Sequence, residues 1–342
     1  STDKIRVQIL DIKKEEEIIV CQSEYFAESI LKVKYNVSPI NDIFNQTVDS
    51  LWIGAQLNLI DAKKDDRGYF IPKIIVLEPD YLIDASAIAE CFQSYGNSHL
   101  HYFRRKFEPM ANTHYILLGN LANFFLDELI YAEDAASLTF EDVFLKSFRQ
   151  MPFEYASCKE IEENAAFREF MLKARMQFEN IRRVVLNDMP VNGFEVSDCI
   201  LEPSFFSEKY GFQGRLDLLQ LSDEENGMHR IIELKSGKPP YPREDVTRIA
   251  PNHEVQTVVY RLMIQSVFGK DPRHIYPTIL YSAAENEGEN LRFAATYRQL
   301  EKEIINIRNL IVATENNLYA GDSQTVEDTF QQLFDLGNYG RT

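Results

Sequence analysis

Three short stretches decide the fold: Phe212–Leu221 (FQGRLDLLQL), His229–Lys238 (HRIIELKSGK) and His253–Tyr260 (HEVQTVVY). The first two stretches are rich in apolar residues and flank the polar turn SDEENGM, which predicts an antiparallel hairpin. The third stretch has helical spacing and follows Pro251, a residue that suits the first turn of a helix. Two strands followed by a helix are therefore the predicted centre of the fold.

The hairpin is expected to bring two carboxylates and an amine together. We expect Asp217 in the middle of the first strand, where an unpaired carboxylate is costly to bury. On the second strand, a period of two puts Glu233 and Lys235 on one face and Ile232 and Leu234 on the other. A Mg²⁺ ion would offset the cost of the carboxylates, and Lys235 would orient or deprotonate a water that attacks a phosphodiester. A surface hairpin with one Glu–Lys pair is the alternative.

The predicted helix adds further polar candidates. Gln256 and Tyr260 are four residues apart and share one face, where an amide and a phenol suit contact with a DNA strand. A partly buried tyrosine with a glutamine neighbour is the alternative. His253 lies one turn before Gln256 and is a candidate DNA contact or a simple surface histidine. Glu202 precedes Asp217 by 15 residues and is a candidate ligand of a second metal.

Taken in order, Asp, Glu-x-Lys and Gln-x-x-x-Tyr resemble the RecB-like branch of the PD-(D/E)XK nucleases. The surrounding sequence is most similar to the nuclease domain of the nuclease–helicases that trim Okazaki-fragment flaps. The similar segments are IIVLEPDYLIDASAIAEC, YILLGNLANFFLDEL, FSEKYGFQGRLD, IIELKSGK, NHEVQTVVYRLMI and TILYS. The resemblance runs discontinuously from about residue 74 to about residue 317. It implies an α/β (α+β) fold with a restriction-endonuclease-like mixed central sheet flanked by helices.

The resemblance also implies roles for single residues. The metal ligands for Mg²⁺ or Mn²⁺ would be Asp217, Glu233 and the backbone carbonyl of Leu234; Lys235 would be the catalytic lysine, and Gln256 and Tyr260 would position the DNA. A metal-binding histidine of the family corresponds to Asn123 here, and a neutral amide is a poorer donor than a carboxylate for a hard cation. A weak or inactive module that binds DNA or docks a partner is therefore the alternative function. A hydrolase that acts on nucleotides or RNA is a third candidate function.

The cysteines depart from the family's iron–sulfur cluster, which needs one cysteine upstream and three downstream. The four present are Cys21, Cys91, Cys158 and Cys199. None follows the Gln-x-x-x-Tyr stretch, and no pair has C-x-x-C spacing. We therefore expect no iron–sulfur cluster and reduced, structural cysteines.

A chain of 342 residues predicts more than one unit. Residues 1–78 alternate short β-like runs with polar turns, which predicts a small OB-like β-barrel. Residues 79–320 would form the nuclease domain, and residues 321–342 a C-terminal helix and linker. Within the nuclease domain we expect helices over 84–107, 113–132, 160–188 (ending before Pro190) and 293–314, and a strand over 277–282.

Charge limits the partners. A net charge of −17 opposes tight non-specific duplex binding, although Arg215, Lys238, Arg243, Arg248 and Arg261 lie near the proposed site in sequence. A threaded single strand or DNA flap fits this charge better. The resemblance also implies a helicase domain or protein as a candidate partner. The chain has no P-loop, so we expect no ATPase motor of its own. No apolar run reaches the ~18 residues of a membrane span and no signal peptide is recognisable, so we expect a cytoplasmic protein without membrane contact.

Overall fold

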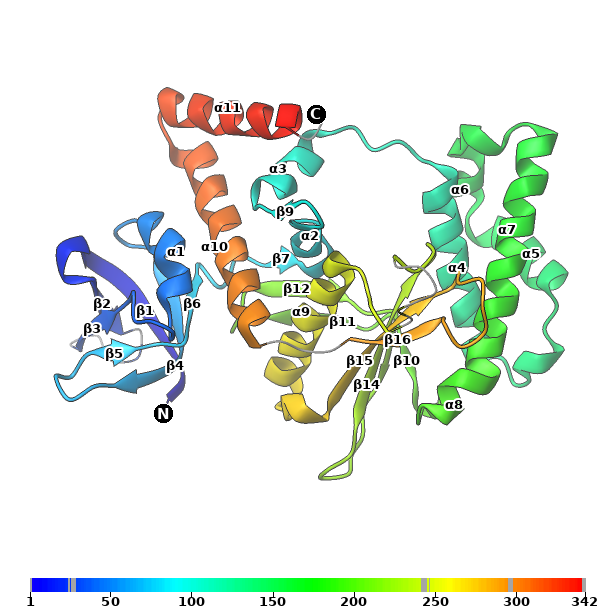
Figure 1. The fold of residues 1–342 in the computed structure, drawn as a ribbon, viewed down its shortest axis with the longest axis horizontal. Coiled ribbons are helices and arrows are strands. Elements are labelled where there is room, and N and C mark those ends of the chain that lie inside the picture. The colour runs from blue at the N-terminus through cyan, green and yellow to red at the C-terminus, as the bar shows by residue number, and fades with distance from the viewer. Residues whose placement is uncertain are drawn as a thin grey trace.

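The computed structural model describes residues 2–339, except residues 24, 26–28, 241–244, 246 and 295–297. A β-barrel at the N-terminus stands beside a larger unit in which a twisted sheet is flanked by helices (Figure 1). The long helix α10 (Arg298–Ala320) lies between the two, although it comes from the other end of the chain.

Five short strands close the N-terminal barrel. They are β1 (Thr2–Lys13), β2 (Ile18–Ser23), β3 (Ile30–Lys34), β4 (Gln56–Lys64) and β5 (Phe70–Ile71). Their order is β1-β2-β3-β5-β4, and β4 pairs again with β1. Helix α1 (Asn45–Asp49) connects β3 to β4, and β6 (Ile74–Leu77) adds to β4. Alternate residues of β1 and β4, such as Val7, Ile9, Leu57 and Leu59, fill the barrel because successive side chains point to opposite faces. The expected barrel is confirmed.

The second unit is built on a five-stranded mixed sheet. Its order is β10 (Ile200–Leu201), β13 (Leu218–Gln220), β14 (His229–Lys235), β15 (Ile275–Tyr281) and β16 (Leu291–Phe293). The predicted hairpin is confirmed, because Leu218 pairs antiparallel with Ile232 across β13 and β14. The partner of β14 on its other side, β15, runs parallel to it. A connection between parallel neighbours needs a crossover, which helix α9 (Pro251–Phe268) supplies.

Helices cover both faces of this sheet, as expected. Ile231 packs in the same core as Val259 of α9, whereas Ile232 packs in a second core with Phe125 of α4 (His114–Tyr131) and Phe178 of α7 (Asn164–Arg183). The period of two in β14 therefore sorts its side chains between two helical layers. Glu233 is two residues from Ile231 and shares the α9 side.

Several expected helices have different bounds. The predicted helix over 84–107 is wrong, because a small hairpin of β8 (Phe92–Gln93) and β9 (Gly96–Asn97) separates α2 (Ala85–Ala89) from α3 (Leu100–Phe107). Helix α7 continues as a π-helical turn over Val184–Asp188 and then as α8 (Met189–Val191), so the helical path passes Pro190 rather than ending before it. Helix α10 begins later and ends later than predicted.

The remaining elements complete the larger unit. A three-stranded sheet contains β11 (Ser204–Ser207), β12 (Phe212–Arg215) and β7 (Ile83–Asp84). Helices α5 (Phe140–Gln150) and α6 (Pro152–Ser157), which the sequence reasoning missed, pack beside α4 and α7. The C-terminal helix is α11 (Ser323–Tyr339), and the rest of the expected linker lies outside the described residues.

Helix α10 holds the barrel against the larger unit. The guanidinium of Arg308 donates to the carbonyls of Leu77, Glu78, Tyr81 and Gly211, which belong to the barrel end, the connection after it and the turn before β12. Barrel residues and residues of α9 and α10 also share one hydrophobic core. The boundary proposed at residue 78 thus follows the end of β6, but the contacts across it are extensive.

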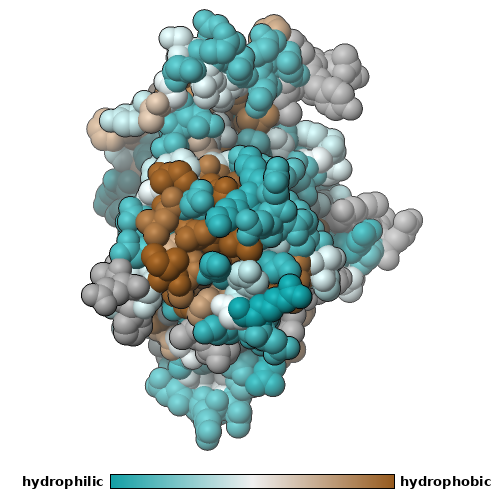
Figure 2. Space-filling model, turned by 90° about the vertical axis from the view of Figure 1, so that its left-hand side faces the viewer, coloured by the Kyte–Doolittle hydropathy of each residue, from teal (hydrophilic) through white to brown (hydrophobic). Residues whose placement is uncertain are grey.

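Apolar side chains gather on the face of the molecule that carries the barrel (Figure 2). The large apolar side chains exposed on the described part of the barrel are Leu10, Tyr25, Ile30 and Ile53. Among the helices of the described residues, none combines the length and apolarity that crossing a membrane requires.

Candidate functional site

Asp217 lies at a break between two strands. The expectation that Asp217 lies in the middle of one strand is wrong: β12 ends at Arg215, β13 begins at Leu218, and the two belong to different sheets. The neighbouring chain segment is interrupted at the same place, between the end of β10 and the start of β11. There Glu202 has a left-handed φ of 50°, and its N–H donates to the Asp217 carbonyl at 3.1 Å. Because the chain bends here, the Asp217 carboxylate turns toward β14, and its Oδ2 accepts from Leu234 N at 2.6 Å.

Glu233 sits at the centre of the site. Its side chain is 8% exposed, and Oε1 accepts from Lys235 Nζ at 3.1 Å and from Gln256 Nε2 at 2.6 Å. The other oxygen, Oε2, is buried and has no hydrogen-bond donor among the described residues. A buried carboxylate oxygen without a donor is costly, so this atom calls for a proton or a cation.

Gln256 and Tyr260 hold the lysine and the glutamate in place. Gln256 Oε1 accepts from Lys235 Nζ at 2.8 Å, and its Nε2 also donates to the Tyr260 hydroxyl at 3.0 Å. That hydroxyl donates to the Arg215 carbonyl at 2.8 Å. Lysine can only donate, so the amide oxygen of Gln256 must face it. Both Gln256 and Tyr260 are buried and bond to protein groups here, so their expected contact with DNA stays a prediction.

The two carboxyl groups are coupled. Burial, together with the charge of Glu233, raises the pKa of Asp217 well above its usual range. Burial also raises the pKa of Glu233, while the Lys235 ammonium opposes that shift. Two carboxylates this close repel, and without a cation one proton between them is favoured. Burial raises the pKa of the Tyr260 hydroxyl as well, so it is a neutral donor at pH 7.

This donor set fits a divalent cation that takes few protein ligands. No cluster of three or more His, Cys, Asp or Glu side chains suited to a metal occurs within the described residues. Asp217 and Glu233 supply two carboxylates, one with a bare buried oxygen. Mg²⁺ in particular typically binds proteins through one or two carboxylates and keeps several waters, and phosphate oxygens of a substrate complete its coordination shell. The Leu234 carbonyl as a third ligand stays a prediction.

One face of helix α4 borders the site. Gly119, Asn123 and Asp127 follow at intervals of four and so share this face. A Cβ on Gly119 would lie 3.3 Å from Ser236 Oγ, directly after Lys235. Burial and the charges of Glu202 and Glu128 raise the pKa of Asp127 to about 7. Asn123 therefore lies between two residues that approach the site, although its role as a ligand stays a prediction.

Asp127 is a site neighbour that the sequence reasoning missed. An acidic residue one turn after Asn123, on the same face of a helix already assigned to the site, was the available signal. Arg215 stands between the acidic groups: its guanidinium lies 3.5 Å from Glu202 and opposes the rise in the Asp127 pKa.

The other candidates lie at the edge of the site. His253 is half-buried and exchanges a hydrogen bond with the Tyr281 hydroxyl at 2.8 Å. Burial and the nearby charge of Lys235 lower its pKa to about 3, so the imidazole is neutral at pH 7. Most of the nearby basic side chains are paired, since Lys238 contacts Glu285 and Arg261 contacts Glu301. Arg243 lies outside the described residues.

Comparison with known proteins gives one assignment. The sequence model of the PD-(D/E)XK nuclease superfamily matches residues 118–335, which is more than half of the chain. Among solved structures, a candidate exonuclease from Eubacterium rectale is similar at 13% identity and a TM-score of 0.40; the match covers 69% of this chain and 82% of that one. No curated protein matches. At that TM-score the structural likeness carries no argument, so the assignment rests on the family match.

Proposed function

Because the chain belongs to the PD-(D/E)XK nuclease superfamily, we propose that it is a nuclease that uses Mg²⁺ or Mn²⁺ to hydrolyse phosphodiester bonds of single-stranded or flapped DNA. The metal would be held by Asp217, Glu233 and the Leu234 carbonyl, with Asn123 as a weaker candidate ligand. When bound, it would polarise the phosphate and lower the pKa of a coordinated water.

One observation carries the proposal: the buried, donor-free Oε2 of Glu233 beside the carboxyl group of Asp217. A structural carboxylate at this depth would normally find a donor for each oxygen. Here the neighbouring Asp217 relieves Glu233 only by keeping a proton itself, because the bond between the two carboxyl groups lowers the pKa of Glu233 and raises that of Asp217. This arrangement supports a site kept for a cation, and the ammonium of Lys235 two residues away supports phosphodiester chemistry.

Lys235 has the geometry to act on a water or a phosphate. Two of its three protons point to Glu233 Oε1 and Gln256 Oε1, at 3.1 and 2.8 Å. The side chain keeps 23% of its surface exposed, so its third proton has access to solvent. An ammonium held by two acceptors loses little entropy when it binds a third group. We assign Lys235 to orienting the attacking water or neutralising charge on the phosphate, and Gln256 and Tyr260 to positioning Lys235.

The finer identity is also part of the proposal. The order of Asp217, Glu233-Leu234-Lys235 and Gln256…Tyr260 supports the RecB-like branch and a role in processing flaps during replication or repair. The net charge of −17 supports a single strand over a duplex, because duplex binding depends more strongly on cationic contacts. A helicase domain or protein is the partner we expect to deliver that strand.

Replacing Lys235 by alanine tests the proposal. We expect Mn²⁺-dependent cutting of a 5′-labelled flap or single strand to fall by roughly 10²–10⁴-fold, because the water loses its positioned proton partner. Lys173→Ala is the matched control, since Lys173 is an exposed lysine of α7 that pairs with Glu169. Equal melting temperatures would establish that both variants fold. Undiminished cutting by Lys235→Ala would remove this lysine from the mechanism.

A second candidate function has one observation in its favour. Asn123 stands where the resembled nucleases have a metal-binding histidine, so the site offers one strong ligand fewer. A DNA-binding or partner-docking module with the nuclease fold would then bind a labelled strand equally well with and without Mn²⁺, and would cut none of the substrates among single strand, duplex, flap and RNA.

A further inference from the structure

A basic pocket lies where the barrel meets helix α10, on a different part of the fold from the carboxylate site. Its cavity volume is about 530 Å³. The charged lining consists of Lys63, Lys64, Lys73, Lys302, Asp61 and Asp65. Four positive and two negative side chains give the lining a formal charge of +2, although the whole chain carries −17. A positive concavity on so acidic a molecule needs an explanation.

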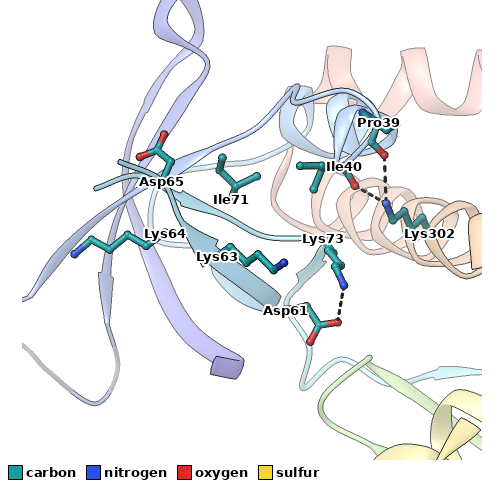
Figure 3. Close-up of a pocket in the computed structure, with 9 residues that line it drawn as sticks. All are labelled: Pro39, Ile40, Asp61, Lys63, Lys64, Asp65, Ile71, Lys73 and Lys302. Carbon is teal, nitrogen blue, oxygen red and sulfur yellow. Dashed lines mark hydrogen bonds and ion pairs between the residues drawn. The ribbon is translucent and has the colours of Figure 1, made fainter. Parts of the chain in front are cut away.

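Three of the lysines converge in the pocket. Lys63 points toward Lys73 and Asp61, and Lys302 reaches in from α10, whereas Lys64 points away (Figure 3). Asp61 lies beside this group, but its ion pair with Lys73 is long, at 3.8 Å, and about half-exposed; the charge of Asp42 also acts on Lys302. The backbone of Lys63 pairs with Ile71 in the barrel, but its side chain makes no hydrogen bond or ion pair with another described residue. Partial burial, with a smaller contribution from the charge of Lys73, lowers the pKa of Lys302, while the charge of Asp42 opposes this shift.

Other contacts hold Asp65 and Lys302 of the lining in place. Asp65 Oδ1 accepts from the backbone N–H groups of Arg67 and Tyr69, so that oxygen is used by its own turn. Lys302 Nζ donates to the carbonyls of Pro39 and Ile40, which fixes the ammonium at the rim. Ile40 and Ile71 give the pocket an apolar part. A cluster of cations beside an apolar wall suits the phosphate of a nucleotide better than a bare ion.

The pocket is connected to the carboxylate site through neighbouring residues of α10. Lys302 faces the barrel, while Glu301, the residue before it, bonds to Arg261 Nη2 at 2.6 Å. Arg261 directly follows Tyr260 on α9, the helix that positions Lys235. A strand bound in the pocket would therefore contact α10, which is bonded to α9, the helix that positions Lys235.

We propose that Lys63, Lys73 and Lys302 form a binding site for phosphate groups of a single-stranded nucleic acid, outside the carboxylate site. This proposal rests on the proposed nuclease function for its choice of a nucleic-acid strand, and its chemistry requires only phosphates. It assigns the barrel a share in holding the substrate, by contacts to the backbone that do not depend on sequence.

Charge-changing substitutions test the pocket in both directions. Lys63→Gln/Lys73→Gln removes two cations that make no strong contacts, so the barrel should stay folded. In EDTA, the affinity of this double variant for fluorescein-labelled dT20 should fall roughly 10- to 30-fold at 0.1 M salt. The plot of the logarithm of the association constant against the logarithm of the salt concentration should become less steep by about 1.4. Asp61→Asn removes the competing carboxylate and should tighten binding; Asn also tolerates the left-handed φ of 51° at this position.

The control and the competitors decide the source of the phosphate. Lys14→Gln/Lys32→Gln removes the same charge from exposed barrel positions outside the pocket and should leave the affinity nearly unchanged. Equal losses of dT20 affinity in both double variants would overturn the proposal, because the overall electrostatic field of the barrel would then explain the binding. It would also be overturned if inorganic phosphate or ADP binding were lost in the pocket variant while dT20 binding stayed the same, which would make the pocket a small-anion site. Binding in EDTA does not need catalysis, so an inactive protein that still lost dT20 affinity in the pocket variant would fail only the nuclease proposal.

Discussion

At the scale of single residues, the site is a compromise between burial and charge. Glu233 has one satisfied oxygen and one bare oxygen, and Asp217 stands beside it. Lys235 offsets part of the repulsion, but of the two Glu233 oxygens it donates only to Oε1. A site built for stability alone would place an amide or an apolar side chain here, because a buried carboxylate without full pairing costs stability. Under the proposed function, these residues are arranged for metal binding at the expense of the stability of the metal-free fold.

The first prediction is that Glu233→Gln stabilises the protein in EDTA. The raised pKa of Glu233 means that the folded state disfavours the ionised carboxylate. Below about pH 4 the Glu233 carboxyl is protonated in both states and this cost to folding is absent. The cost grows as the pH rises from the pKa of Glu233 in the unfolded chain through its pKa in the folded protein. At pH 8 the variant should melt roughly 1–3 °C above the wild type, with little difference near pH 4.

Differential scanning calorimetry across pH 4–8 checks this sign. Glu224→Gln is the control, because Glu224 is exposed in the turn of the hairpin and its substitution should shift melting equally little at every pH. A Glu233→Gln variant that melts below the wild type at pH 8 in EDTA would mean that the carboxylate stabilises the metal-free fold, contrary to this account.

At the scale of elements, the site depends on interruptions of regular structure. Asp217 is turned toward β14 because β12 and β13 separate there. Gly214, on β12, makes room for α9: a Cβ on it would lie 3.0 Å from Tyr260 Cε1 and 3.1 Å from Ala85 Cβ. Close backbone approach of this kind is a common reason for a glycine inside a strand.

Gly214→Ala should therefore both destabilise the protein and weaken the site. Overpacking should cost about 1–3 kcal/mol in the free energy of unfolding. Because the clash includes the Tyr260 ring, cutting should fall more than the loss of folded protein explains. Gly237→Ala is the matched control, since a Cβ on Gly237 meets nothing within 4 Å. Urea unfolding and flap cutting measure the two effects, and a Gly214→Ala variant as active and stable as Gly237→Ala would contradict the packing described.

The sequence predicted elements with strong periodicity and missed features set by tertiary contacts. The β13–β14 hairpin, α4, and α9 starting at Pro251 were predictable, because alternation, helical spacing and an N-terminal proline each have a local cause. The break at Asp217 depends on pairing with the segment around Glu202, and the β8–β9 hairpin within 84–107 on packing against neighbours. Gln256 and Tyr260 were found by spacing, but their burial against Glu233 was not readable from spacing.

At the scale of the whole molecule, α10 joins two units that the sequence separated at residue 78. Arg308 is fully buried and donates to carbonyls on both sides of that boundary. Asn309 adds bonds to Ile75 O and from Leu77 N in the last barrel strand. The shared core and these bonds predict one cooperative transition for barrel and nuclease unit together.

Arg308→Leu should break this coupling. Removing the guanidinium leaves several buried carbonyls without donors, which should cost about 3 kcal/mol or more in the free energy of unfolding. Trp52, the single tryptophan, reports on the barrel, and far-UV circular dichroism reports mainly on the helices of the nuclease unit. The two urea transitions should coincide in the wild type and separate in the variant.

Arg273→Leu is the control for this prediction, because Arg273 is exposed and pairs only with Asp271 on the surface. Its two transitions should stay together near the wild-type midpoint. Coincident, unshifted transitions in Arg308→Leu would show that the buried arginine does not couple the units.

Calorimetric titration of Mn²⁺ into the wild type and into Asp217→Asn tests the central claim most directly. We expect saturable binding to the wild type at millimolar metal, tighter at higher pH because the carboxyl pair must lose its proton. The Asp217→Asn variant should stay folded and lose this binding, while Glu224→Gln should keep it. Absence of binding to the wild type, or equal binding to wild type and Asp217→Asn, would contradict the assignment of Asp217 and Glu233 as the metal site.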